Sequence, residues 1–189
     1  IADWYRKHGY QFLAISDHNI LQAKEVWMNV AAVEKRRKAL GKTTMEKYRA
    51  RFGESWVETR DEEGRIFVRL KKLAEYRPLF EKPGEFLLVE AEEISASFVA
   101  ENKSKVPVHL NAIDPGELFK PVEGTSIRDV LRQNLQAIRD QEKRLGRPIL
   151  AHVNHPNFQW ALTAEDIAEA VEENYVEVYN GHPGVHVNG

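Results

Sequence analysis

The chain has 189 residues, of which 42% are hydrophobic and 18 are Phe, Trp or Tyr, so it can form one domain with a packed core and is not a largely disordered chain. Its 27 Lys and Arg are balanced by 29 Asp and Glu, which excludes nucleic-acid binding through a strong overall basic charge. Cysteine is absent, so thiol nucleophiles, disulfides and Cys-ligated zinc are excluded. No run approaches the ~18 consecutive apolar residues of a membrane span, and we expect no membrane partner.

Helical and extended patterns alternate along the chain. In order, they predict a helix over 1–9, a strand over 10–16, a helix over 21–40, a short helix over 43–53, a β-hairpin over 56–70, strands over 85–90 and 106–113, a helix over 126–145, a strand over 149–153, a helix over 163–171 and a strand over 175–180. Thr43 with Glu46 forms a capping box for the second of these helices, and Gly64 marks the hairpin turn.

The alternation of strands and helices indicates an α/β fold with a parallel sheet and helical crossovers. An open doubly wound sheet and a (β/α) barrel both fit this pattern. Residues 34–82 differ from the rest, because they hold 15 Lys or Arg against 9 Asp or Glu in a chain that is slightly acidic overall. We interpret 34–82 as a helix-and-hairpin insertion within a single domain over 1–189.

Polar side chains cluster at the ends of the predicted strands. Asp17 and His18 follow the first strand, Glu93 follows the strand over 85–90, and His109 lies within 106–113. The strand over 149–153 leads into two candidate ligands, His152 and His155. Because the carboxyl ends of parallel strands share one face of an α/β fold, these side chains are expected to meet there. Imidazole nitrogens and carboxylate oxygens bind Zn, Mn or Fe, which favours a metal-dependent hydrolase.

Several polar residues have simpler interpretations. His182 and His186 lie in a tail that contains Gly and Pro, and we interpret them as solvated loop residues. The basic run over 35–38 is interpreted as the solvated end of a helix, where the helix dipole favours cations. Serine-hydrolase, P-loop and dinucleotide-binding motifs are absent from the sequence.

Five short segments, in this order, resemble the polymerase and histidinol phosphatase (PHP) family, in particular its stand-alone metal-dependent phosphoesterase-like members. They are Ala14-Ile15-Ser16-Asp17-His18-Asn19, Glu92-Glu93-Ile94-Ser95, Val108-His109-Leu110-Asn111-Ala112, Asn154-His155-Pro156 and Val176-Glu177-Val178-Tyr179-Asn180-Gly181. The resemblance covers most of the chain outside 34–82. It implies an incomplete, distorted (β/α)7 TIM-like barrel, the PHP fold, with two or three divalent metal ions at the strand ends of the intact protein.

The resemblance also implies roles for individual residues. His18, Glu93, His109 and His155 match metal ligands, and His152 competes with His155 because Ala151-His152 also resembles a family motif. Asp17, His18 and Glu93 are the implied catalytic residues. Glu177 and Asn180 match a motif that supports the ligands.

Two family motifs have no counterpart in the sequence. The resemblance places a His-x-His motif before Ile1 and an Asp-x-His motif after Gly189, and we therefore expect 1–189 to be a partial PHP domain that binds metal poorly by itself.

The implied activity is phosphate-ester hydrolysis by metal-bound hydroxide, on a small phosphorylated substrate. Three alternatives stay open at this point. The barrel could be a catalytically degenerate scaffold or binding module, or the same metals could hydrolyse an amide or a carboxylic ester. Nucleic acid is a less favoured substrate, held by the basic insertion over 34–82, and its binding should weaken steeply with salt.

Overall fold

The computed structural model describes residues 1–35, 43–170, 175–182 and 185. The chain divides into two compact units, the first formed by Ile1–Leu21 with Phe80–Gly189 and the second by Gln22–Leu79. The second unit begins earlier in the chain than the insertion that the sequence predicted over 34–82. The boundary between the units falls within the helix α4 (Leu73–Phe80).

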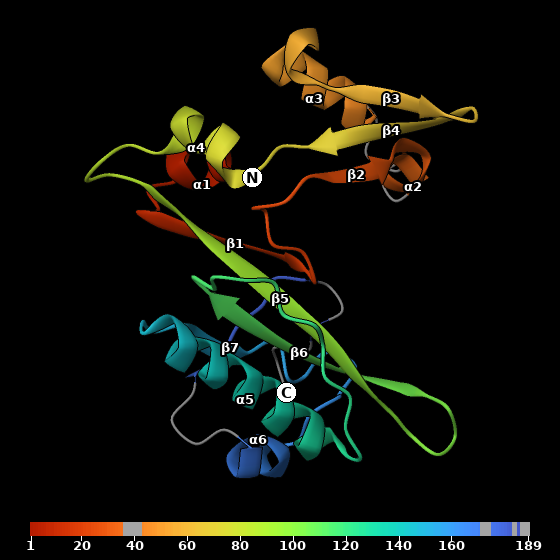
Figure 1. Ribbon diagram of the computed structural model, residues 1–189, viewed down its shortest axis with the longest axis vertical. Helices are drawn as coiled ribbons and strands as arrows, with labels where there is room; N and C mark the ends of the chain where they lie inside the picture. The colour runs from red at the N-terminus through yellow and green to blue at the C-terminus, as the bar shows by residue number, and fades with distance from the viewer. Residues whose placement is uncertain (36–42, 171–174, 183–184, 186–189) are drawn as a thin grey trace. The chain divides into compact units, whose positions relative to one another are not determined.

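A five-stranded sheet forms the centre of the first unit (Figure 1). Its strands, in spatial order, are β1 (Phe12–His18), β5 (Leu87–Val99), β6 (Lys105–Ile113), β7 (Leu150–Val153) and β8 (Tyr175–Val176). β1 is parallel to β5 and β7 is parallel to β8, but β6 runs antiparallel to both of its neighbours. Among the described residues the sheet is open, with β1 and β8 at its edges.

The α/β class is therefore confirmed, but the prediction of an entirely parallel sheet is wrong. The connection between β5 and β6 is only residues 100–104. A parallel crossover needs a dozen residues or more, so these two strands can only form a hairpin. β5 also continues to Val99, well beyond the predicted end at residue 90, and carries Glu92 and Glu93 within the strand.

The helix α5 (Ile127–Leu145) covers one face of this sheet (Figure 1). The predicted helix is confirmed: the Ser126 hydroxyl caps its first turn, and Gly146 ends it in the left-handed conformation with φ of 65°. Its apolar stripe packs against alternate residues of β5 and β6. The core consists mainly of Ile94, Ala96, Val108, Leu110, Ala112, Val130, Leu131, Leu135, Ile138 and Val153.

The shorter helices of the first unit are α1 (Ala2–Lys7) and α6 (Ala164–Ala170). Thr163 and Asp166 cap α6 reciprocally, as predicted, whereas Val171 lies outside the described residues. Of the helices within the described ranges, none combines the length and the apolar character needed to cross a bilayer.

The second unit contains a three-stranded antiparallel sheet in the order β2 (Val26–Asn29), β4 (Arg65–Leu70), β3 (Thr59–Glu62). Its helices are α2 (Val30–Lys35), α3 (Thr44–Phe52) and the 3-10 turn η2 (Glu54–Trp56). The capping box of Thr43 and Glu46 and the hairpin with its turn at Gly64 are both confirmed.

The predicted helix over 21–40 is wrong in its first part, because residues 26–29 pair with β4 instead. The predicted helix rested on the helical spacing of Val26, Trp27, Val30, Val33 and Leu40, but Val26 and Trp27 pair with β4 in the sheet instead. The side-chain oxygen of Asn29 then accepts the N–H groups of Ala31 and Ala32 and begins α2. Leu40, Gly41 and the basic residues 36–38 lie outside the described residues.

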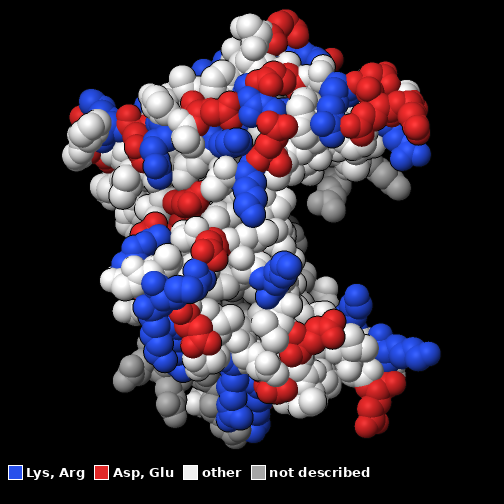
Figure 2. Space-filling view, in the orientation of Figure 1, with Lys and Arg blue, Asp and Glu red and all other residues white. Residues whose placement is uncertain are grey.

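Many basic side chains of the second unit have acidic partners. Arg69 is buried and donates hydrogen bonds to the carboxylates of Glu58 and Glu75, and Lys71 contacts Glu58 as well. Figure 2 shows Lys and Arg interspersed with Asp and Glu over this unit rather than separated from them. Several basic side chains of this unit are therefore held in ion pairs rather than left for a ligand.

Candidate metal centre

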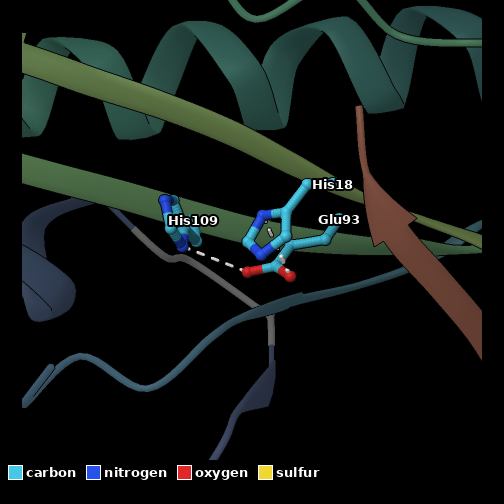
Figure 3. A group of neighbouring side chains, drawn as sticks. All are labelled: His18, Glu93 and His109. Atoms are coloured by element: carbon cyan, nitrogen blue, oxygen red, sulfur yellow. Dashed lines mark ion pairs between the residues drawn. The ribbon is translucent and has the colours of Figure 1, made fainter. Parts of the chain in front are cut away.

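Three side chains from three strands meet on the face of the sheet opposite α5 (Figure 3). His18 is the last residue of β1, Glu93 lies within β5 and His109 lies within β6. One potential ligand atom from each lies within 4.8 Å of the other two. Nδ1 of His18 is 3.4 Å from Oε2 of Glu93, and Nδ1 of His109 is 3.1 Å from Oε1. The structure therefore brings together three of the four ligands predicted from the sequence.

Strand register and alternation place these side chains. His18 is paired with Glu93 in the parallel ladder of β1 and β5, so the end of β1 lies beside the carboxylate. On β6, Val108 and Leu110 are fully buried in the core under α5, and His109 between them points to the other face. The same alternation on β5 buries Ile94 in the core and leaves Glu93 on the face of His109.

His155, the fourth predicted ligand, approaches the same carboxylate from the segment after β7. Its Nε2 lies 3.2 Å from Oε1 of Glu93, and its ring centroid is 5.1 Å from that of His109. The backbone of His155 has a φ of 20°, which is uncommon for a residue with a side chain. Its N–H donates to Oε2 of Glu177 at 2.7 Å, and this hydrogen bond holds the unusual turn in place.

Glu93 and the imidazoles around it shift one another's pKa values. Burial of this carboxyl favours its protonated form, but the adjacent nitrogens of His109 and His155 and the charge of His18 outweigh burial and hold the pKa of Glu93 well below its usual range. Burial favours the neutral form of His155, but the Glu93 carboxylate outweighs this and raises the pKa of His155 above its ordinary value. The centre thus keeps a negative carboxylate among imidazoles.

One nitrogen in this cluster lacks a hydrogen-bond partner. Nδ1 of His109 is buried and close to Glu93, but it is not aligned for a hydrogen bond to Oε1 or to any other atom of the described residues. A buried polar nitrogen without a partner is costly in a protein interior. Imidazole nitrogens and carboxylate oxygens at this separation are the donors that Zn, Mn and Fe accept, so the residues present fit a divalent metal.

Neighbouring side chains hold the candidate ligand His18 in position. Oγ of Ser95 is 2.5 Å from Nδ1 of His18 and hydrogen-bonded to it, which orients the ring. Asn19, directly after β1, forms three hydrogen bonds to β5. Its backbone N–H donates to the carbonyl of Glu93, its side-chain oxygen accepts the N–H of Ser95, and its side-chain nitrogen donates to the carbonyl of Ser95. Ser95 was not predicted as a site residue, although its position two residues after Glu93 on the same strand face indicates it.

The structure does not bring Asp17 and His152 into this cluster. Asp17 lies between Ser16 and His18 on β1, so strand alternation turns it to the opposite face. Nε2 of His152 lies 3.2 Å from the side-chain nitrogen of Asn111, and burial lowers the pKa of His152. The ring of His155, not that of His152, contacts Glu93.

A cavity of about 340 Å³ opens over the cluster. Its walls include the four predicted ligands and two residues that the sequence did not indicate as site residues, Phe158 and His182. No sequence motif points to Phe158. His182 was interpreted as a solvated loop residue, and His186 lies outside the described residues.

Comparison of the chain with protein-family models, with curated proteins and with solved structures found no match.

Proposed function

We propose that this protein is a metal-dependent hydrolase that acts on phosphate esters. The observation that carries the proposal is the convergence of His18, His109 and His155 on the carboxylate of Glu93, with Nδ1 of His109 buried and without a hydrogen-bond partner among the described residues. Divalent metals bound there lower the pKa of water to about 7 and polarise a phosphoryl oxygen. We propose two or three Zn, Mn or Fe ions in the intact protein.

The residues of this chain contribute binding and orientation. His18, Glu93, His109 and His155 hold the metals, Ser95 orients the His18 ring, and Glu177 fixes the backbone of His155. The cavity volume of about 340 Å³ is in the range of small-molecule sites, which supports a small phosphorylated substrate.

The proposal includes a fold like that of the PHP family. The parallel pairs β1–β5 and β7–β8 direct the carboxyl ends of β1 and β7 toward the site, as strands do in (β/α) folds. Together with the resemblance to the PHP family, this supports an incomplete, distorted (β/α)7 barrel in which β5 and β6 form a hairpin.

The test of the proposal uses the chain together with any residues that its gene encodes before Ile1 and after Gly189. The protein is stripped with a chelator and reloaded with Zn²⁺, Mn²⁺ or Fe²⁺, and metal content is measured alongside activity. We expect metal-dependent hydrolysis of para-nitrophenyl phosphate and none of para-nitrophenyl acetate. Activity on the acetate alone would assign the site to carbonyl substrates, and failure to bind metal would favour a scaffold.

The two histidines after β7 are distinguished by substitution. We expect His155→Ala to lower phosphatase kcat by at least about 100-fold, because it removes a ligand that contacts Glu93, while the unfolding temperature changes little. His152→Gln should keep activity close to that of the unsubstituted protein, because His152 contacts Asn111 rather than Glu93. Retained activity in His155→Ala with loss in His152→Gln would reassign the ligand to His152.

A further inference from the structure

The segment after β8 carries His182 to the wall of the cavity, and hydrogen bonds connect it to the metal centre. Oε1 of Glu177 accepts the side-chain N–H of Asn180 at 3.0 Å, while Oε2 of the same carboxylate accepts the N–H of His155. The side-chain oxygen of Asn180 accepts the N–H of His182 at 2.8 Å. The backbone of His182 is therefore positioned by the carboxylate that positions the ligand His155.

A second anchor lies on the other side of His182. Val185 is buried, forms an antiparallel bridge with Phe158, and donates its N–H to the carbonyl of His182 at 2.9 Å. Phe158 in turn follows His155 closely in the chain and donates its N–H to the carbonyl of His155 at 2.8 Å. His182 is thus attached to the metal centre along two routes, one polar and one through the Phe158–Val185 bridge.

The rings form a row from the metal ligands outward. The ring centroid of Phe158 lies 5.3 Å from that of His155 and 6.0 Å from that of His182, in an edge-to-face arrangement in both cases. His182 is exposed, whereas His155 is half-buried, and both line the cavity. The row therefore leads from the half-buried ring of His155 to an exposed imidazole on the cavity wall.

Phe158 and His182 line the same cavity as the four predicted metal ligands. A phosphate monoester whose phosphoryl group is held at His18, Glu93, His109 and His155 would therefore have its ester oxygen and organic group in this cavity, next to the other side chains that line it. Histidine is the side chain that most often transfers protons near neutral pH. We infer that His182 is a catalytic residue, the general acid that protonates the leaving ester oxygen, and that the organic part of the substrate lies against Phe158.

The proton balance is simple. Water adds its oxygen to phosphorus and releases one proton to solvent, the bond between phosphorus and the ester oxygen breaks, and the ester oxygen takes a proton from the imidazole ring of His182. The products are an alcohol and inorganic phosphate, and His182 regains its proton from solvent. One water is consumed and no atom is oxidised or reduced.

This inference rests on the proposed function, and its experiment separates the two. The hydrolysis of an alkyl phosphate (glycerol phosphate) and of para-nitrophenyl phosphate is compared in the metal-loaded protein, in His182→Gln and in the control His8→Gln. His8 is an exposed histidine of the same unit, located after α1, and it does not line the cavity. Metal content and circular dichroism are measured for all three proteins.

We expect His182→Gln to lower kcat/KM for the alkyl phosphate by about 100-fold or more, since an alkoxide needs a proton in order to leave. The same substitution should lower kcat/KM for para-nitrophenyl phosphate by less than about tenfold, because nitrophenolate leaves without protonation. Metal content should be unchanged, and His8→Gln should match the unsubstituted protein on both substrates.

Equal losses on both substrates, or none on either, would overturn the role of His182 as a general acid while the proposed function stands. If the unsubstituted protein hydrolyses neither phosphate, the proposed function fails, and the inference fails with it. A second measurement does not need turnover. Inorganic phosphate added with Zn²⁺ should protect His182, but not His8, from modification by diethyl pyrocarbonate. Equal modification with and without phosphate would place His182 outside the substrate site.

Discussion

Replacing Glu93 by Gln should lower the affinity of the protein for Zn²⁺ or Mn²⁺ by at least about 100-fold. Substitution of groups that merely support metal ligands costs about 10- to 100-fold, and Glu93 contacts all three imidazoles directly. Gln keeps the size of the side chain but removes the negative charge that attracts the metal. Titration against a chromophoric chelator measures the affinity.

Glu101→Gln is the matched control for this substitution. Glu101 lies in the exposed turn between β5 and β6 and should leave metal affinity unchanged. Metal binding by Glu93→Gln at the affinity of the unsubstituted protein would show that the cluster is not the metal site.

The same substitution should change the pH dependence of folding in the metal-free protein. The pKa of Glu93 is held below its ordinary value of 4.5, so its contribution to stability is present above pH 4.5 and is lost as the pH falls through the folded-state pKa. The pKa of His155 is raised above 6.5, so its contribution is full below pH 6.5 and is lost at higher pH. The contribution of this cluster to the free energy of unfolding should therefore be greatest between pH 4.5 and pH 6.5. In Glu93→Gln the free energy of unfolding should depend less on pH, both below and above this range.

The neighbouring carboxylate, Glu92, should give stability a pH dependence opposite to that from Glu93. Glu92 is fully buried on the α5 side of the sheet, where Oε2 accepts the N–H of Phe119 at 2.8 Å and Oε1 has no hydrogen-bond partner in the part of the chain that the structure describes. Burial raises the pKa of Glu92 to about 7, more than the hydrogen bond from Phe119 lowers it. The folded protein therefore prefers Glu92 protonated, and it loses stability as the pH rises from 4.5 through 7.

We expect Glu92→Gln to raise the free energy of unfolding by up to about 3 kcal/mol at pH 8 and to change it little at pH 4.5. Gln is neutral at both pH values and can still accept the N–H of Phe119. Urea unfolding in the presence of a chelator measures both values, with Glu101→Gln as the control. An equal change at the two pH values would show that Glu92 is ionised in the folded protein throughout this range.

Glu92 and Glu93 show what could be predicted from the sequence and what required the structure. The run after residue 90 indicates that one of the pair points inward, and the resemblance selects Glu93 as the ligand. Only the register of β5 against β6 shows that Glu92 faces the core and Glu93 faces His109. A shift of one residue would exchange them, because strand side chains alternate between the two faces.

Local signals predicted the local structure well. The capping residues Thr43, Ser126 and Thr163 each begin a helix where predicted, and Gly64 lies in the predicted turn. These signals succeed because a cap or a tight turn depends on hydrogen bonds and backbone conformations within a few residues. The apolar residues over 21–40 also have a helical spacing, but residues 26–29 pair with β4, far along the chain, and this pairing overrides it.

The sequence by itself determined the α/β class, most element positions and the candidates His18, Glu93 and His109 for the cluster. The tertiary structure decided that β6 is antiparallel, that His155 rather than His152 contacts Glu93, and that Phe158 and His182 line the cavity. The physical reason is the range of the interactions. Caps and strand patterns arise within a few residues, whereas a metal centre depends on the register of strands that are far apart in the chain, and that register is set when the core packs under α5.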